Sequence, residues 1–241
     1  MTGTPLVSRT AVLLSVLVLV SGCTRIVDGT VHPASGLTPS PLTGRAVKQV
    51  LLDDAELEKM LEQPFESDPN LAPRFGDDAF DERPDVSSPD CALAVGLMQK
   101  SSYDSADVQE AAREIWWTPR DDRDATVIDV EEGVVALPSV ADADTAFEEL
   151  TKQWEHCDGE AVTSRGDTFT LSRPKVADSV LSASTSFSFD SGTIPGVRAL
   201  GVRVNCLVEV QVSFYRDVSG ERKSSAVDIA HTMMDKVTAL S

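Results

Sequence analysis

The spacing of hydrophobic and polar positions changes along the chain, and two stretches show it most clearly. Residues 140–157 carry apolar side chains at intervals of four, three and four, namely Ala143, Phe147, Leu150 and Trp154. This period predicts an amphipathic helix. Residues 198–215 alternate instead, with Val202, Val204, Cys206, Val208, Val210, Val212 and Phe214 on one face and Arg203, Asn205, Glu209, Gln211 and Ser213 on the other. This alternation, with Leu207 as its exception, predicts one half-buried strand long enough to require a bulge or a bend.

Weaker patterns predict the remaining elements. Further helices are expected at 51–61, from Ser88 onward and at 223–239. A hairpin is expected from strands at 109–118 and 125–138, followed by strands at 160–164, 167–173 and 179–189. Strands mostly follow strands in this order, which favours antiparallel pairing. The pattern therefore predicts one α+β domain over residues 47–241, with a largely antiparallel sheet and helices packed on one face.

The first 22 residues have the features of a bacterial lipoprotein signal peptide. Arg9 precedes an apolar run at residues 11–20, and a Ser-Gly pair of small residues follows. A helix of this length spans about 15 Å, roughly half the hydrocarbon core of a bilayer, so the run is too short to cross a membrane. The sequence Val-Ser-Gly-Cys resembles a lipobox, with Val20 where leucine is usual, and this resemblance implies that Cys23 carries a diacylglycerol group. The alternative is an ordinary secretory signal followed by a chance cysteine.

Composition agrees with an envelope location. Residues 23–46 are rich in Pro, Gly, Ser and Thr, which predicts a flexible tether between the lipid and the domain. The net charge of −18 argues against binding of nucleic acid and against electrostatic attraction to an anionic membrane surface. We therefore expect a protein held by lipid on the extracytoplasmic face of the cell membrane. Its expected partner is a small molecule or another envelope protein.

The cysteines other than Cys23 predict one disulfide, because an exported chain enters an oxidising space. Cys206 lies on the apolar face of its predicted strand, and Cys157 ends a helix whose apolar stripe should pack on that face. A Cys157–Cys206 bond is therefore favoured, and Cys91–Cys157 remains the main alternative. No metal or other cofactor is expected. The three histidines are dispersed, and the acidic segment 77–85 lacks the spacing of a calcium loop.

Several short segments occur in an order that resembles a known family. They are Leu51–Leu57, Cys91 in a helix leading to Tyr103, Val134–Ser139 followed by Ala141–Ala143, Gln153–Cys157, Arg198–Leu200 and Asn205. Together they resemble the PknH-like extracellular sensor domains of mycobacterial receptor kinases and actinobacterial lipoproteins. The resemblance covers most of residues 47–241 and implies an α+β domain with a cleft for an unidentified ligand. Family members usually carry two disulfides, but this chain has no cysteine after residue 206, so the resemblance does not assign the pairing.

The sequence contains no motif typical of enzymes. It lacks a Gly-x-Ser-x-Gly nucleophile motif, a His-Glu-x-x-His metal motif and a phosphate-binding glycine loop. The pairs Glu155–His156 and Glu148–Glu149 fit a solvated helix better than a catalytic site. We therefore expect no catalytic residues and no enzymatic activity.

Aromatic residues supply the candidate binding site. Trp116 and Trp117 are adjacent in a predicted strand and must face opposite sides, so that one can be exposed near Arg120. With Tyr103 these residues could line a ligand site, and packing in the core is the alternative reading. The favoured function is a sensor-like lipoprotein that binds a ligand or a partner. A lipid or glycolipid carrier and a structural or regulatory partner of an envelope protein are the alternatives.

Overall fold

The computed structural model describes residues 39–67, 73–82, 86–88, 90–91, 96–164, 166–216 and 225–241. Its α-helices are α1 (Asp54–Leu61), α3 (Val140–His156) and α4 (Ser225–Leu240). Short 3-10 helices are η1 (Gly44–Val50), η2 (Gly76–Ala79) and η3 (Lys100–Tyr103). The strands are β1 (Glu66–Ser67), β2 (Arg74–Phe75), β3 (Glu110–Trp117), β4 (Val127–Ala136), β5 (Ala161–Ser164), β6 (Asp167–Ala177), β7 (Val180–Phe189), β8 (Gly192–Arg203) and β9 (Cys206–Phe214).

The strands form one antiparallel sheet in the order β1-β3-β4-β9-β8-β7-β6-β5, with β2 also paired to β3. All described residues belong to one compact unit. The predicted α+β class, antiparallel sheet and single domain are confirmed. The predicted hairpin of β3 and β4 and the helices α1, α3 and α4 are also present, within a few residues of their expected bounds. The helix expected from Ser88 lies largely outside the described residues.

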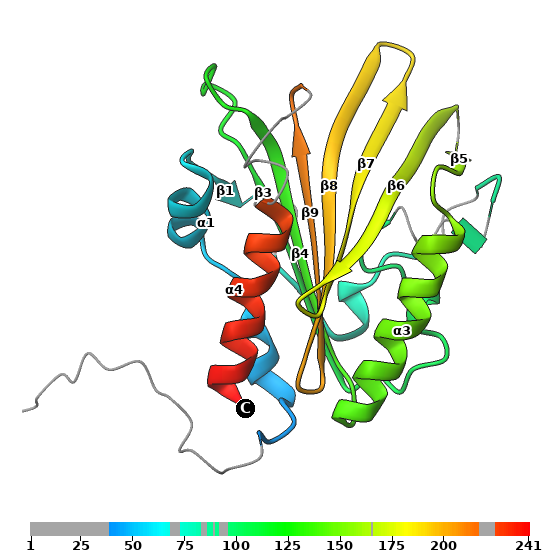
Figure 1. Cartoon of the computed structure of the whole chain (residues 1–241). Helices are drawn as coiled ribbons and strands as arrows, with labels where there is room; N and C mark the ends of the chain where they lie inside the picture. Colours follow the sequence, from blue (N-terminus) through cyan, green and yellow to red (C-terminus); the bar gives the residue numbers. More distant parts are fainter. Residues whose placement is uncertain are drawn as a thin grey trace, which may run out of the picture. The chain divides into compact units, whose positions relative to one another are not determined.

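The two long helices lie on opposite faces of the sheet (Figure 1). Even-numbered residues of β9, from Cys206 to Phe214, belong to the core that α4 and η1 cover. Leu207 points to the other face and belongs with Trp154 of α3 to a second core. The prediction that the helices pack on one face is therefore wrong. Leu207, the exception in the alternation, contributes with Leu181 and Leu200 to an apolar surface on the second face, and α3 packs there.

Residues 198–215 form two strands, not one. β8 and β9 are joined at Val204 and Asn205, and Arg203 pairs with Cys206 across this turn. The backbone of Val204 has a φ of 52°, in the left-handed region that such a tight turn requires. The Asn205 side chain donates to the carbonyl oxygens of Leu42 (3.0 Å) and Leu137 (2.6 Å), which holds the turn against neighbouring segments.

The folded part begins before residue 47. Leu42 is 2% exposed and packs in the core with Val47 and Val50 of η1, so residues 42–46 belong to the domain and not to the tether. Asp53 caps α1, with a capping box formed with Glu56. The predicted signal peptide, Cys23 and most of the predicted tether lie outside the described residues.

The disulfide joins Cys91 to Cys157, and the favoured Cys157–Cys206 pairing is wrong. Cys157 and Cys206 lie on opposite sides of the sheet, since Cys157 follows α3 and Cys206 faces α4. Cys206 is a buried free thiol, and burial raises its pKa to about 12.

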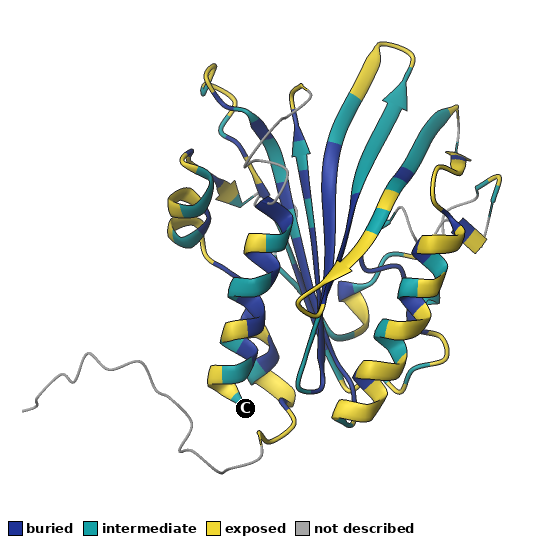
Figure 2. Ribbon diagram, viewed as in Figure 1, coloured by how far each residue is buried: buried dark blue, intermediate teal, exposed yellow. Residues whose placement is uncertain are grey.

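The helices leave part of the sheet uncovered. Figure 2 shows β7 and β8 buried along one half and half-buried or exposed along the other, whereas β6 is half-buried or exposed except at Leu171. In β7, residues 180–183 are buried and residues 184–189 are half-buried. This uncovered half contains the candidate functional site.

Candidate functional site

A groove of about 400 Å³ lies on the face of the sheet that α3 packs against, beyond the rows that α3 covers. Side chains from six strands, β3, β4, β9, β8, β7 and β6, line it. Asp81 and the segment 96–99 also contribute to the lining. We call this site the sheet groove. Its volume lies within the range of small-molecule sites in proteins.

Apolar side chains line the sheet groove at both of its sides. On β6 and β7, Phe169 and Phe187 stack with ring centroids 4.5 Å apart, and Ile194 of β8 is paired with Phe187. On β3, Trp117 is 36% exposed and is among the few large hydrophobic residues left open to solvent in the described part of the chain. An exposed aromatic residue in a concave site is typical of ligand-binding surfaces.

A polar row crosses the floor between these apolar sides. Trp117 on β3 pairs with Asp129 on β4, and Asp129 pairs with Ser213 on β9. The Ser213 hydroxyl donates to Asp129 Oδ1 at 3.1 Å. The pKa of Asp129 is raised to about 7, mainly by burial and also by the nearby charge of Glu131, while the hydrogen bond from Ser213 opposes this rise. Asp129 is therefore a carboxyl group that loses its proton near neutral pH.

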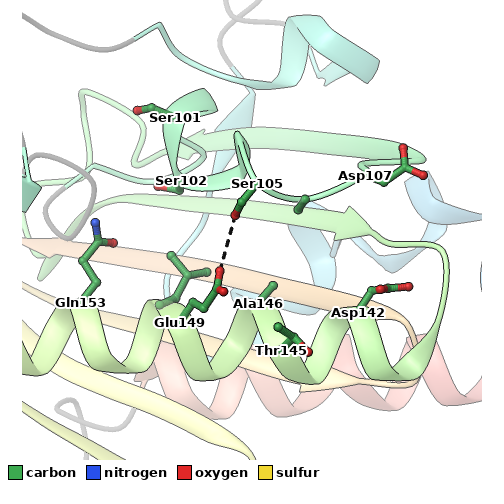
Figure 3. Close-up of a pocket in the computed structure, with 11 residues that line it drawn as sticks. Ser101, Ser102, Ser105, Asp107, Asp142, Thr145, Ala146, Glu149 and Gln153 are labelled. Carbon is green, nitrogen blue, oxygen red and sulfur yellow. Dashed lines mark hydrogen bonds between the residues drawn. The ribbon is translucent and has the colours of Figure 1, made fainter.

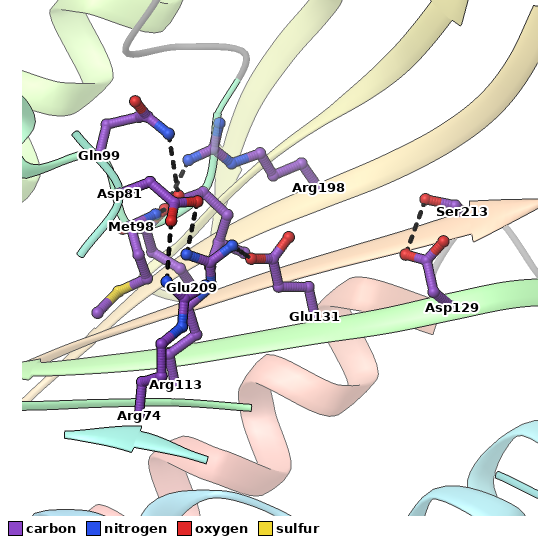
Figure 4. A network of polar contacts seen from close by, with 11 residues as sticks. Arg74, Asp81, Met98, Gln99, Arg113, Asp129, Glu131, Arg198, Glu209 and Ser213 are labelled. Carbon is purple, nitrogen blue, oxygen red and sulfur yellow. Dashed lines mark hydrogen bonds and ion pairs between the residues drawn. The ribbon is translucent and has the colours of Figure 1, made fainter. Parts of the chain in front are cut away.

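Arg113 joins two carboxylates beside this row. The guanidinium lies 2.6 Å from Asp81 Oδ2 and also contacts Glu131, as Figure 4 shows. Burial alone would lower the pKa of Arg113, but the two carboxylates outweigh it and the pKa is raised. Burial raises the pKa of the Glu131 carboxyl group, and the positive charge of Arg113 opposes that rise. Arg74 contacts Asp81 from the other side at 3.1 Å, so Asp81 and Glu131 both have basic partners.

Glu209 connects the segment leading into η3 to the sheet. This side chain is 3% exposed and accepts from the Tyr103 hydroxyl (2.5 Å), the Arg198 guanidinium (2.5 Å) and the Met98 backbone N–H (3.4 Å). Burial raises the pKa of Tyr103 well above its usual value, and the charge of Glu209 adds to this. Arg198 also lies over the ring of Trp154, 4.9 Å from its centroid. These contacts hold one rim of the sheet groove in place.

Gly196 allows two side chains to cross the middle of the floor. A Cβ atom there would lie 2.5 Å from Gln211 Nε2 and 2.6 Å from Thr185 Oγ1. Those two side chains hydrogen-bond to each other at 2.9 Å, from β9 to β7 past the intervening strand β8. A larger residue at position 196 would break this bond, so glycine is required by the close approach.

The predicted binding residues separate into different environments. Trp117 lines the sheet groove, and Tyr103 lies behind its rim, bonded to Glu209. Trp116 is in the core on the opposite face, where its indole N–H donates to Glu132 at 3.0 Å. Arg120 is exposed beyond the end of β3 and is not among the lining residues. The structure therefore brings Trp117 into the site and leaves Trp116 and Arg120 outside it.

Sequence reasoning missed Asp129, Glu131, Gln211 and Ser213. The alternation placed Gln211 and Ser213 on the polar face of the predicted strand and gave no indication that this face lines a groove. The polar side chains themselves were a usable signal. A central strand covered on both faces usually carries apolar side chains on both, so polar side chains in such a strand indicate a site.

A second groove of about 390 Å³ lies between α3 and the region of η3 (Figure 3). It is lined mainly by serines and acids, among them Ser105, which donates to Glu149 at 3.4 Å. Glu149 is exposed, and the lining includes no aromatic side chain. The sheet groove offers the richer combination of apolar and polar contacts.

Two general observations apply to the described residues only. No group of three or more His, Cys, Asp or Glu side chains is placed to hold a metal ion there. No helix in the same ranges has the length and apolar character to cross a membrane.

Comparison with known proteins supports the resemblance noted in the sequence. The crystal structure of the extracellular domain of PknH from Mycobacterium tuberculosis matches with a TM-score of 0.69 and 22% identity, over 83% of this chain and 98% of that one. A putative uncharacterized protein from Mycobacterium smegmatis matches at a TM-score of 0.40 and 12% identity, over 80% and 96%. No curated protein matches the chain. The family model described as the PknH-like extracellular domain matches residues 42–236. The chain therefore belongs to the PknH-like extracellular domain family, and this region is an extracytoplasmic, sensor-like domain.

Proposed function

We propose that the protein is a cell-envelope lipoprotein whose extracytoplasmic domain binds a small-molecule ligand in the sheet groove, without catalysing a reaction. The observation that carries this proposal is the groove itself. It combines the exposed Trp117, the half-buried pair Phe169 and Phe187, and polar side chains that point into the same space. Concave sites with apolar walls and a few convergent polar groups are the usual form of ligand sites.

The contacts around the groove favour a preformed site. Glu209 and Arg113 each connect several segments through buried hydrogen bonds and ion pairs. Such networks limit the side chains to one arrangement, so that little conformational entropy is lost when a ligand binds.

The chemistry of the lining supports binding without catalysis. Its described residues include no histidine, cysteine or lysine, and Ser213 donates directly to Asp129 without an intervening base. Arg113 is engaged by two carboxylates. Activated nucleophiles in enzymes normally depend on an adjacent base that is in turn oriented by a third group.

The membrane attachment is tested by fractionation of the full-length protein. The native chain should be found in the membrane fraction, and Cys23→Ser should leave it, because the substitution removes the sulfur that would carry the lipid. Equal membrane association of both forms would contradict the lipid anchor.

Ligand binding is tested on protein purified from its own membrane, by native mass spectrometry. A small molecule should be retained by the native chain and by Arg120→Ala and lost by Trp117→Ala. The two variants form a matched pair, because both residues are exposed near the end of β3 but only Trp117 lines the sheet groove. Retention of a lipid or of a stoichiometric protein partner, unaffected by Trp117→Ala, would contradict the proposal and favour a carrier or an interaction role.

A further inference from the structure

We propose that the sheet groove binds an organic cation, whose ammonium group lies between Asp129 and Trp117 and whose apolar body extends toward Phe187. The inference rests on the proposed function, since it names the ligand class of the same site. It is carried by the arrangement of charge, aromatic surface and apolar surface along one face of the sheet.

Charge is the first argument. Three carboxyl groups line the sheet groove, and one guanidinium, that of Arg113, lies among them. Asp81 and Glu131 are both paired with Arg113. Among the described residues Asp129 contacts no basic side chain, and its side-chain bond is to the neutral Ser213 hydroxyl. A ligand that carries a positive charge would supply the missing partner, whereas an anion would be repelled.

The aromatic neighbour is the second argument. Trp117 and Asp129 are directly paired across β3 and β4, so their side chains project from the same face with Cβ atoms about 5 Å apart. Tryptophan is the side chain whose ring face attracts cations most strongly. A carboxylate next to an exposed indole therefore forms a two-sided site for an ammonium group.

The floor of the groove sets the place of the ligand's body. From Asp129 the register continues through Ser213 to Gly196, which has no side chain of its own and is crossed by the hydrogen bond between Gln211 and Thr185. Two residues further along the strands, on the same face, are Ile194 on β8 and Phe187 on β7. Strands are about 4.8 Å apart, so that β8 lies about 10 Å and β7 about 14 Å from β4. An aromatic or aliphatic body that spans about 10–14 Å across the strands would reach from the Asp129 carboxylate to Ile194 and Phe187.

The test compares three probes that share one body, namely 4-phenylbutylamine, 4-phenylbutanol and 4-phenylbutyrate. Binding to the full-length protein in a nonionic detergent is measured by titration calorimetry. The amine should bind at least about tenfold more tightly than the alcohol, and the carboxylate most weakly. In Asp129→Asn the preference for the amine should fall to about twofold or less. Because each probe is compared between variants in the same detergent, partitioning into micelles cancels.

Two further variants make the result specific. Glu149→Gln removes an exposed carboxylate from the second groove and should leave the amine preference unchanged. Trp117→Leu keeps an apolar side chain but removes the ring, and it should weaken the amine more than the alcohol. Circular dichroism of each variant verifies that it is folded.

Other outcomes would overturn the inference. They are equal binding of the three probes, tighter binding of the carboxylate, no binding of the amine, or an amine preference that survives Asp129→Asn. The proposed function would still stand if the co-purified molecule depended on Trp117, and it would fall separately if that dependence were absent.

Discussion

Replacement of Glu209 by glutamine should destabilise the domain by about 3–5 kcal/mol. The change keeps the size of the side chain but leaves the guanidinium of Arg198, which is 2% exposed, without its carboxylate 2.5 Å away. Removal of one member of a buried ion pair costs about this much, because the remaining buried charge loses the carboxylate that compensated it. The hydrogen bond from Tyr103 would also lose its charged acceptor, and Tyr103→Phe alone should cost about 1.5–3 kcal/mol.

The assay is urea denaturation followed by far-ultraviolet circular dichroism, with the disulfide intact. Since Tyr103 and Glu209 share one hydrogen bond, the double variant should be less destabilised than the sum of the two single variants, by about 1–2 kcal/mol. Glu149→Gln, at an exposed carboxylate, should stay within about 0.5 kcal/mol of the native chain. A loss below about 1 kcal/mol for Glu209→Gln, or additive single effects, would refute the view that this network holds the rim of the groove.

Two further predictions concern the disulfide and the buried carboxyl groups. Cys91→Ser should lower the free energy of unfolding by about 4 kcal/mol, because the bond to Cys157 closes a loop between residues 66 positions apart. The free energy of unfolding should decrease as pH rises from about 5 to 8.5, as measured by urea denaturation at each pH. Burial is the main cause that raises the pKa of Glu132 to about 8 and that of Asp129 to about 7. At a pH between the unfolded and the folded pKa of each group, the folded state binds more protons than the unfolded state, so stability falls as pH rises.

Each of these predictions has a matched control. A reducing agent should destabilise the native chain and leave Cys91→Ser unchanged, and Cys206→Ala, which removes a free thiol, should cost only about 1 kcal/mol. Glu132→Gln should flatten the pH dependence, since the amide keeps the shape and does not titrate. Stability that rises between pH 5 and 8.5, or an unchanged slope in Glu132→Gln, would contradict the assignment of these carboxyl groups.

The local periodicity of the sequence predicted the elements that depend on local geometry. The spacing from Ala143 to Trp154 predicted α3, and the alternation around Cys206–Phe214 predicted β9. The period of a helix or strand is a property of its own backbone, and neighbouring segments change it little. The order of short motifs likewise indicated the family to which the chain belongs.

The alternation failed where two strands meet. It continues through Val204 although the chain turns there, because a turn of two residues leaves the spacing of apolar positions undisturbed. Nothing in the pattern records that Val202 lies on the face of Leu207 and not on that of Cys206. The same loss of information produced the wrong pairing for Cys157, since the face of the sheet on which α3 packs was not determined locally.

The sequence by itself determined the kind of elements, the family and the expected location. Each of these is encoded in residues that lie close together in the chain, namely the periodic segments, the short motifs and the leader-like first residues. Only the tertiary structure decided which strands are neighbours, and with that the disulfide and the sheet groove. Trp117, Asp129 and Ser213 meet because β3, β4 and β9 pair side by side, although Asp129 and Ser213 are 84 residues apart. Such contacts depend on the packing of the whole sheet, and no local pattern specifies them.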